Sequence, residues 1–163
     1  MKDKSLKVLK DKNRSRKKDE SLLFSYLNEI GIIAQLANNE FERNLPDGLT
    51  VSQFSVLNWF VRVDSEATPG RLADAFQVTA GAMTNTLKKL ASKGFVRLEP
   101  DASSGRRKRV TLTRKGREMR ERAIACTSPL LAEFGQAMNA MDFEQQLKQL
   151  RQVRTYFDTR RYS

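Results

Sequence analysis

The chain has 163 residues, enough for one domain with a sizeable core or for two small ones, and 30 Lys and Arg against 19 Asp and Glu give it a net charge of +11. It has no histidine and one cysteine, Cys126, which excludes histidine-based metal sites, Ser-His or Cys-His catalytic pairs and an intramolecular disulfide, and fits a reducing compartment. No apolar run approaches the ~20 residues of a membrane-spanning helix, and no hydrophobic segment follows the charged N-terminus, so we expect a cytoplasmic protein that contacts no membrane.

Residues 1–20 differ in composition from the rest of the chain. They are poor in apolar side chains and hold nine Lys or Arg against four Asp or Glu, a net charge of +5. This composition predicts a basic arm that is disordered or weakly helical. Three roles stay open for it: a solvated tail with no function, a phosphate-binding arm without sequence preference, or a helical extension of a dimer interface.

The spacing of apolar residues predicts a first helix that ends at about Arg43. Its stripe consists of Leu22, Leu23, Tyr26, Leu27, Ile30, Ile33 and Ala34. A turn at residues 45–48 separates it from a second helix, which Thr50 and Gln53 begin with the spacing of a capping box. The apolar face of this second helix carries Phe54, Leu57, Phe60 and Val61.

A third helix follows the polar residues 64–68. Thr68 and Pro69 suit the N-cap and the first helical position. The apolar residues of this helix are Leu72, Ala73 and Phe76. Residues 77–78 then form the turn that leads into the next helix.

Thr79 is suited to cap a fourth helix that runs to Lys93 and ends at Gly94, and the free amides of its first turn favour a phosphate oxygen. On a helical wheel, the face that packs on the second and third helices carries Met83, Thr86, Leu87 and Leu90. The opposite face carries a glycine, short polar side chains and a cation, at Gly81, Thr84, Asn85, Lys88 and Ser92. Any surface helix has a polar face, so the pattern alone does not assign a ligand.

This polar face nevertheless has the chemistry of a helix that enters the major groove of DNA. Gly81 lets the backbone come close to the duplex, and Thr84 and Asn85 reach base edges or phosphates. Lys88 and Lys89 supply positive charge. The fourth helix is therefore a candidate recognition helix.

Residues 95–98 and 108–112 have strand character, and residues 100–105 supply the turn of a hairpin with a loose tip. Four consecutive cations follow that turn: Arg106, Arg107, Lys108 and Arg109. Alternation along a strand sends Arg107 and Arg109 to one side and the other two cations to the opposite side. Charges on a strand can simply block aggregation, but four exceed that need, and an arginine at a hairpin tip suits a narrow minor groove. Residues 79–115 carry a net charge of +8, so helix and hairpin together predict double-stranded DNA as the partner.

Two further helices complete the chain. Thr113 is suited to cap a long helix through about Ala140, which Pro129 should kink or interrupt. A last helix begins at residues 141–142, with Phe143, Leu147, Leu150, Val153 and Phe157 on one stripe. The predicted fold is mainly α with a small β-hairpin wing: a winged helix-turn-helix with long N- and C-terminal helices, in one continuous domain.

The segments LTVSQFSVL, TAGAMTNTLKKLASKGFV and LEPDASSGRRKRVTLT resemble the second helix, the recognition helix and the wing of the MarR family of bacterial transcription regulators. The residues that match the wing pattern are Asp101, Arg106, Val110, Leu112 and Thr113. The resemblance covers residues 21–160 and implies Arg106 as the tip arginine, a role that Arg107 could share. Ser104 stands where the family often has an aspartate that helps to hold the wing, so the resemblance predicts a more mobile wing here.

The resemblance implies a homodimer that reads a pseudo-palindromic operator, with a winged helix-turn-helix over about 50–113 and dimerisation helices over about 21–43 and 114–160. Members of the family are usually repressors, and many respond to a small aromatic or phenolic effector, while others sense oxidants through cysteine. Nothing in this sequence identifies an effector. Trp59 and Phe54 either line such a cleft or, as we expect, pack in the core, and we expect Cys126 to be a buried, inert thiol.

Two other functions stay open at this stage. A basic architectural or RNA-binding protein with the same fold would bind without sequence choice and would show a steep salt dependence as its only signature. An enzyme is disfavoured, because the sequence shows no paired carboxylates in a plausible cleft, no glycine-rich phosphate loop and no metal cluster. We therefore expect neither a cofactor nor a metal.

Overall fold

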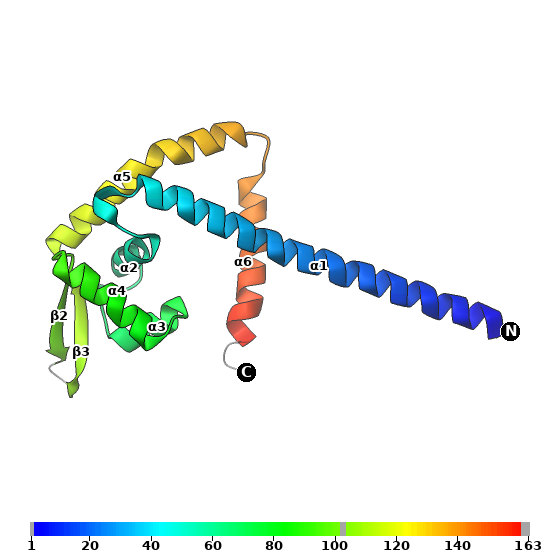
Figure 1. Ribbon diagram of the computed structural model, residues 1–163, viewed down its shortest axis with the longest axis horizontal. Coiled ribbons are helices and arrows are strands. Elements are labelled where there is room, and N and C mark those ends of the chain that lie inside the picture. The colour runs from blue at the N-terminus through cyan, green and yellow to red at the C-terminus, as the bar shows by residue number, and fades with distance from the viewer. Residues whose placement is uncertain (1, 102–103, 161–163) are drawn as a thin grey trace. The chain divides into compact units, whose positions relative to one another are not determined.

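The computed structural model describes the backbone of residues 2–101 and 104–160, and the side chains of residues 17–100 and 108–160 (Figure 1). The elements are α1 (Lys2–Asn44), a 3-10 turn (Pro46–Gly48), α2 (Val51–Arg62), β1 (Glu66–Ala67), α3 (Pro69–Phe76), α4 (Ala80–Ser92), β2 (Val96–Asp101), β3 (Ser104–Leu112), α5 (Arg114–Ala137) and α6 (Phe143–Thr159). This order confirms the predicted mainly helical fold with a small wing. The chain forms two compact units, Met1–Thr127 and Ser128–Ser163, whose boundary lies within α5.

Helix α1 begins at Lys2 and therefore includes residues 2–20. The composition of these residues predicted a disordered or weakly helical arm, and the structure continues helix α1 through them. The segment contains no glycine or proline, and opposite charges recur four residues apart, as at Asp3, Lys7 and Asp11. Both features favour a helix. A continuous helix was not predicted because hydrophobic periodicity detects only helices with an apolar stripe, and this segment has none.

Local capping begins and ends the short helices as predicted. Thr50 and Gln53 form both hydrogen bonds of a capping box at the start of α2. Thr68 Oγ1 accepts from the amide of Arg71 at the start of α3. The turn after α3 contains Gln77 with a φ of 52°, a left-handed conformation that ends the helix and redirects the chain into α4.

The sheet has three antiparallel strands in the order β1-β3-β2, one more than predicted. The additional strand, β1, pairs Glu66 with Thr111 and Ala67 with Val110. It lies in the polar segment between α2 and α3 and has only two residues. Such a strand has no periodicity of its own and exists because it can pair with one edge of β3.

One hydrophobic core runs through residues 45–123, which we call the winged lobe. Its largest fully buried side chains are Leu49, Val56, Leu57, Leu72, Leu87, Leu90 and Val110. Helix α5 closes this core with Met119 and Ala123. Its Gly116 packs so closely that an added Cβ would overlap the carbonyl oxygen of Phe95.

Of the predicted kink or interruption at Pro129, the interruption is wrong, because helix α5 continues across this residue. Proline deprives the carbonyl of Ala125 of its helical partner, but Ala125 is exposed, so water can satisfy that oxygen. Helix α6 begins as predicted, since the side chain of Asp142 accepts from the amide of Gln145 at 2.9 Å.

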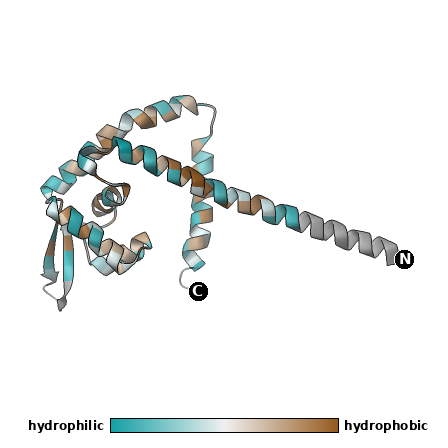
Figure 2. Cartoon of the chain, in the orientation of Figure 1, coloured by the Kyte–Doolittle hydropathy of each residue, from teal (hydrophilic) through white to brown (hydrophobic). Residues whose placement is uncertain are grey.

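Apolar residues recur along α1, α5 and α6 outside the core of the lobe (Figure 2). Most of those on α1 and α6 are exposed, among them Leu22, Leu23, Phe24, Leu147, Leu150 and Phe157. No helix of the described residues is long and apolar enough to cross a membrane.

Candidate nucleic-acid interface

Helix α4 has the two faces that its sequence predicts. Met83, Leu87 and Leu90 are buried in the core of the winged lobe. The opposite face is exposed at Gly81, Thr84, Asn85, Lys88 and Lys89. Thr79 caps the helix, because its hydroxyl accepts from the amide of Ala82 at 3.2 Å. The fold therefore presents the polar and cationic side chains of α4 to solvent.

The exposed side chains of α4 also differ in bonding from other polar groups of the lobe. Within the described part of the chain, Thr84, Asn85, Lys88 and Lys89 make no side-chain hydrogen bond or ion pair. Thr86, beside them, bonds back to the carbonyl of Ala82. Four donors on one face thus remain available to an external ligand, and a ligand rich in acceptors would satisfy them.

Cations close to this face stabilise the lobe itself. The Nζ of Lys93 donates to the carbonyls of Asp47 and Gly48, each at 3.2 Å. Lys115 donates to the carbonyl of Lys93 at 2.9 Å. These lysines tie the end of α4 to the turn before α2 and to α5. No sequence pattern signals this role, because the accepting atoms are backbone oxygens far away along the chain.

The hairpin of β2 and β3 places the predicted wing cations on its returning strand. Val110 is buried and Lys108 is exposed on the same face of the strand, beyond the core. Arg106 and Arg107 were also predicted to contact DNA. Their side chains lie outside the described residues, although the backbone of both belongs to β3.

Arg109, another of the predicted contact residues, has an ion-pair partner within the lobe. Its Nη1 donates to both carboxylate oxygens of Glu66, at 3.1 and 2.9 Å. We predicted a DNA contact for Arg109, but in this structure its guanidinium is occupied by a partner within the lobe. The pair was not foreseen because β1, which brings Glu66 beside β3, was not predicted.

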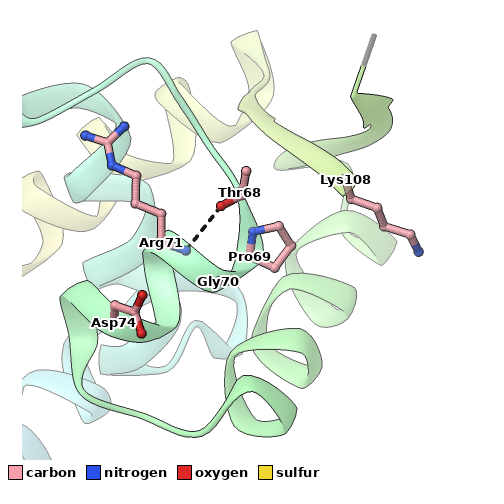
Figure 3. A pocket seen from close by; sticks show the side chains of 6 residues that line it. All are labelled: Thr68, Pro69, Gly70, Arg71, Asp74 and Lys108. Atoms are coloured by element: carbon pink, nitrogen blue, oxygen red, sulfur yellow. Dashed lines mark hydrogen bonds between the residues drawn. The ribbon is translucent and has the colours of Figure 1, made fainter. Parts of the chain in front are cut away.

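A surface hollow separates the start of α3 from the wing (Figure 3). Its lining residues are Thr68, Pro69, Gly70, Arg71, Asp74 and Lys108. The side chains of Arg71 and Lys108 extend to opposite sides of it. Lys108 thus places a cation of the wing beside this hollow.

Arg71 bonds to the carboxylate of Asp64, and its guanidinium lies 5.3 Å from the centroid of the Trp59 ring. This hydrogen bond, together with the amide of Glu66, holds the pKa of Asp64 below its ordinary value. Trp59 and Phe54 pack against the hydrophobic core, as expected.

Cys126 is exposed, so the expectation of a buried thiol is wrong. The residues of α5 that turn toward the core at this point are Ala123 and Thr127. The expectation rested on the usual burial of free cysteine, whereas Cys126 lies off the face of α5 that Ala123 and Thr127 turn toward the core. Among the described residues, no group of three or more His, Cys, Asp or Glu side chains could hold a metal ion.

Comparison with known proteins places this arrangement among transcription regulators. The sequence profile of the MarR family matches residues 47–107, which include α2, α3, α4 and β2. An uncharacterized HTH-type transcriptional regulator of Mycobacterium leprae is 30% identical over 108 residues, which cover 66% of this chain and 75% of that protein.

Solved structures agree with the sequence comparison. The transcriptional regulator BldR from Sulfolobus solfataricus superposes with a TM-score of 0.72 and 26% identity, over 82% of this chain and 94% of that one. The M. tuberculosis transcriptional regulator MOSR, solved in complex with DNA, gives a TM-score of 0.67 and 25% identity over 83% of this chain and 97% of that one.

Proposed function

Because this chain belongs to the MarR family of transcription regulators, we propose that it binds double-stranded DNA in a sequence-specific manner, as a homodimer on a pseudo-palindromic operator. The proposed contact residues on α4 are Thr79, Gly81, Thr84, Asn85, Lys88 and Lys89. Those on the wing are Arg106 and Arg107. A regulator of this kind acts where the DNA lies, so the proposal includes a cytoplasmic location.

The observation that carries the proposal is the exposed, unpaired face of α4. Thr84 and Asn85 are exposed and carry donors and acceptors of the kind that read base edges, and Lys88 and Lys89 add charge for phosphates. The basic wing beside the helix extends the same surface toward a neighbouring groove.

The homodimer is supported by the exposed apolar side chains of α1 and α6. Each helix carries a stripe that the described residues do not cover, including Leu22, Leu23, Leu147 and Leu150. Contiguous exposed apolar stripes favour an interface over a solvated surface. A two-fold axis through these helices would give the DNA two recognition helices, and hence two half-sites about one helical turn apart.

We extend the proposal to repression as the mode of action. A dimer seated in successive major grooves covers its operator and keeps other proteins from the same DNA. A defined operator sequence can be located in a genome, and the promoters found in this way are the ones on which repression can be measured.

The test is selection of preferred sites from random duplex DNA by the purified protein at moderate salt. We expect a two-fold-symmetric site with half-sites ~10 base pairs apart. Arg106→Ala is the companion variant, and it should relax selection at flanking A·T positions while the central half-sites remain.

No enriched site, together with binding that disappears as salt rises, would overturn the proposal. That result would leave the alternative of a basic architectural or RNA-binding protein, which uses the same surface without sequence choice.

A further inference from the structure

Beside the backbone pairing of β1 with β3, an ion pair of side chains joins the wing strand to the rest of the lobe. Glu66 lies opposite Thr111 in the register of β1 and β3, which makes Arg109 its diagonal neighbour on the same face. The ion pair between Glu66 and Arg109 engages both carboxylate oxygens. On β2, Glu99 stands opposite Arg109 but has its own ion pair with Arg97 at 3.6 Å.

Glu66 is also linked to the start of the helix-turn-helix. Its backbone amide donates to the carboxylate of Asp64 at 3.4 Å. Asp64 in turn accepts a hydrogen bond from Arg71 in the first turn of α3. The guanidinium of Arg71 also lies over the ring of Trp59 on α2. One continuous polar network therefore runs from α2 and α3 through β1 to the wing.

This network is poorly explained by stability or by attraction to DNA. The side chains of Arg109 and Glu66 are 40% and 47% exposed, and ion pairs of that exposure contribute little to stability. A carboxylate beside the wing strand also opposes phosphates and occupies a cation that could bind them. The remaining role for the ion pair is to set the position of the wing relative to the helices.

We propose that Glu66 is a positioning residue for DNA reading: through Arg109 it fixes the wing relative to α3 and α4, so that both reach their grooves together. The inference rests on the proposed sequence-specific binding. Site-specific binding needs helix and wing in one relative position, whereas non-specific binding tolerates many. Glu66 thus raises the ratio of specific to non-specific affinity, although it lowers the positive charge of the interface.

The deciding variant is Glu66→Gln, which keeps the shape of the side chain and raises the net charge by one. Simple electrostatics predicts tighter binding to every duplex. Positioning predicts that the ratio of specific to non-specific affinity falls about two- to fivefold, the range set by exposed ion pairs. Glu40→Gln is the matched control, because Glu40 has 46% exposure and an ion pair with Arg43 on α1. It makes the same change in charge and should leave the ratio unchanged.

Arg109→Gln and the double variant complete a cycle. If Glu66 acts through Arg109, the double variant loses no more of the ratio than either single variant does. Hydrogen exchange without DNA gives a second readout: Glu66→Gln should speed exchange of the Val110 and Ala67 amides about two- to fivefold and leave that of Leu87 unchanged.

An unchanged or increased ratio in Glu66→Gln would overturn the inference and would leave Arg109 as an ordinary DNA contact. The preference of the unaltered protein for its selected site over random duplex is measured first. This order separates a failure of the proposed function from a failure of the role of Glu66. A missing preference there overturns the proposed function, whereas a preference that Glu66→Gln does not reduce overturns only the role of Glu66.

Discussion

The winged lobe and the long helices differ in where their apolar side chains lie. In the lobe, Leu57, Leu72 and Leu87 have no exposed surface, and α5 closes the core. On α1, Leu22 and Phe24 keep 69% and 74% of their surface exposed. The lobe can therefore fold around its own core, whereas the long helices need another surface to bury their stripes. The proposed reading of DNA and the proposed assembly thus involve different parts of one short chain.

The largest effect should come from the unburied stripe of α6. Replacing Leu147 and Leu150 together by Asp removes two leucines from the proposed dimer interface and adds two charges. We expect a loss of about 4 kcal/mol of association, or roughly a thousandfold weaker dimer, because each leucine contributes about 2 kcal/mol on full burial. Sedimentation equilibrium measures the change directly.

The control for this variant adds the same two carboxylates to the opposite side of α6. Gln149 and Gln152 lie on its polar face, so replacing both by Asp should leave the dimer intact. Dissociation by both double variants alike would show that added charge, and not the apolar stripe, is responsible, and the comparison of the two regions would fail.

The lobe itself should be most sensitive at Gly116. A Cβ at this position would overlap the carbonyl oxygen of Phe95 and lie 2.8 Å from a methyl group of Leu112, so α5 could not close the core. We expect Gly116→Ala to lower the free energy of unfolding by about 3 kcal/mol. Gly70→Ala on α3 is the control, because nothing lies within 4 Å of its added methyl group. Urea unfolding of both variants tests this, and equal stabilities would mean that α5 does not seal the lobe.

These expectations show which parts of the structure a sequence reveals. Caps such as Thr50 and Thr79 were predictable because each acts within four residues, and the faces of α4 follow from helical geometry. The clash at Gly116 and the partner of Arg109 were not, because both depend on segments more than 20 residues away. The exposed face of α4 was therefore predictable from one helix, whereas the surroundings of Arg109 were not, because a second strand takes part there.

Asn85 separates the function of the lobe from its stability. The side chain is exposed on α4 and is not part of the described core, so Asn85→Ala should leave thermal unfolding unchanged. Binding to the selected operator should weaken by about 2 kcal/mol per half-site, while binding to random duplex changes little. Titrations with both duplexes measure this difference. A uniform loss on the two would make Asn85 a phosphate contact and remove it from base reading.

The smallest effect distinguishes two lysines that lie four residues apart on and after α4. Lys89 has no partner in the described part of the lobe, whereas Lys93 donates to the carbonyls of Asp47 and Gly48. Lys89→Ala should lower the salt slope of DNA binding by about one per subunit and leave unfolding unchanged, because only a lysine at a phosphate releases counterions. Lys93→Ala should do the reverse: it should cost about 1 kcal/mol of stability, as expected for lost hydrogen bonds, and keep the salt slope. An equal fall in the salt slope of both variants would contradict this expectation. Lys93 would then bind DNA as Lys89 does, besides holding the lobe together.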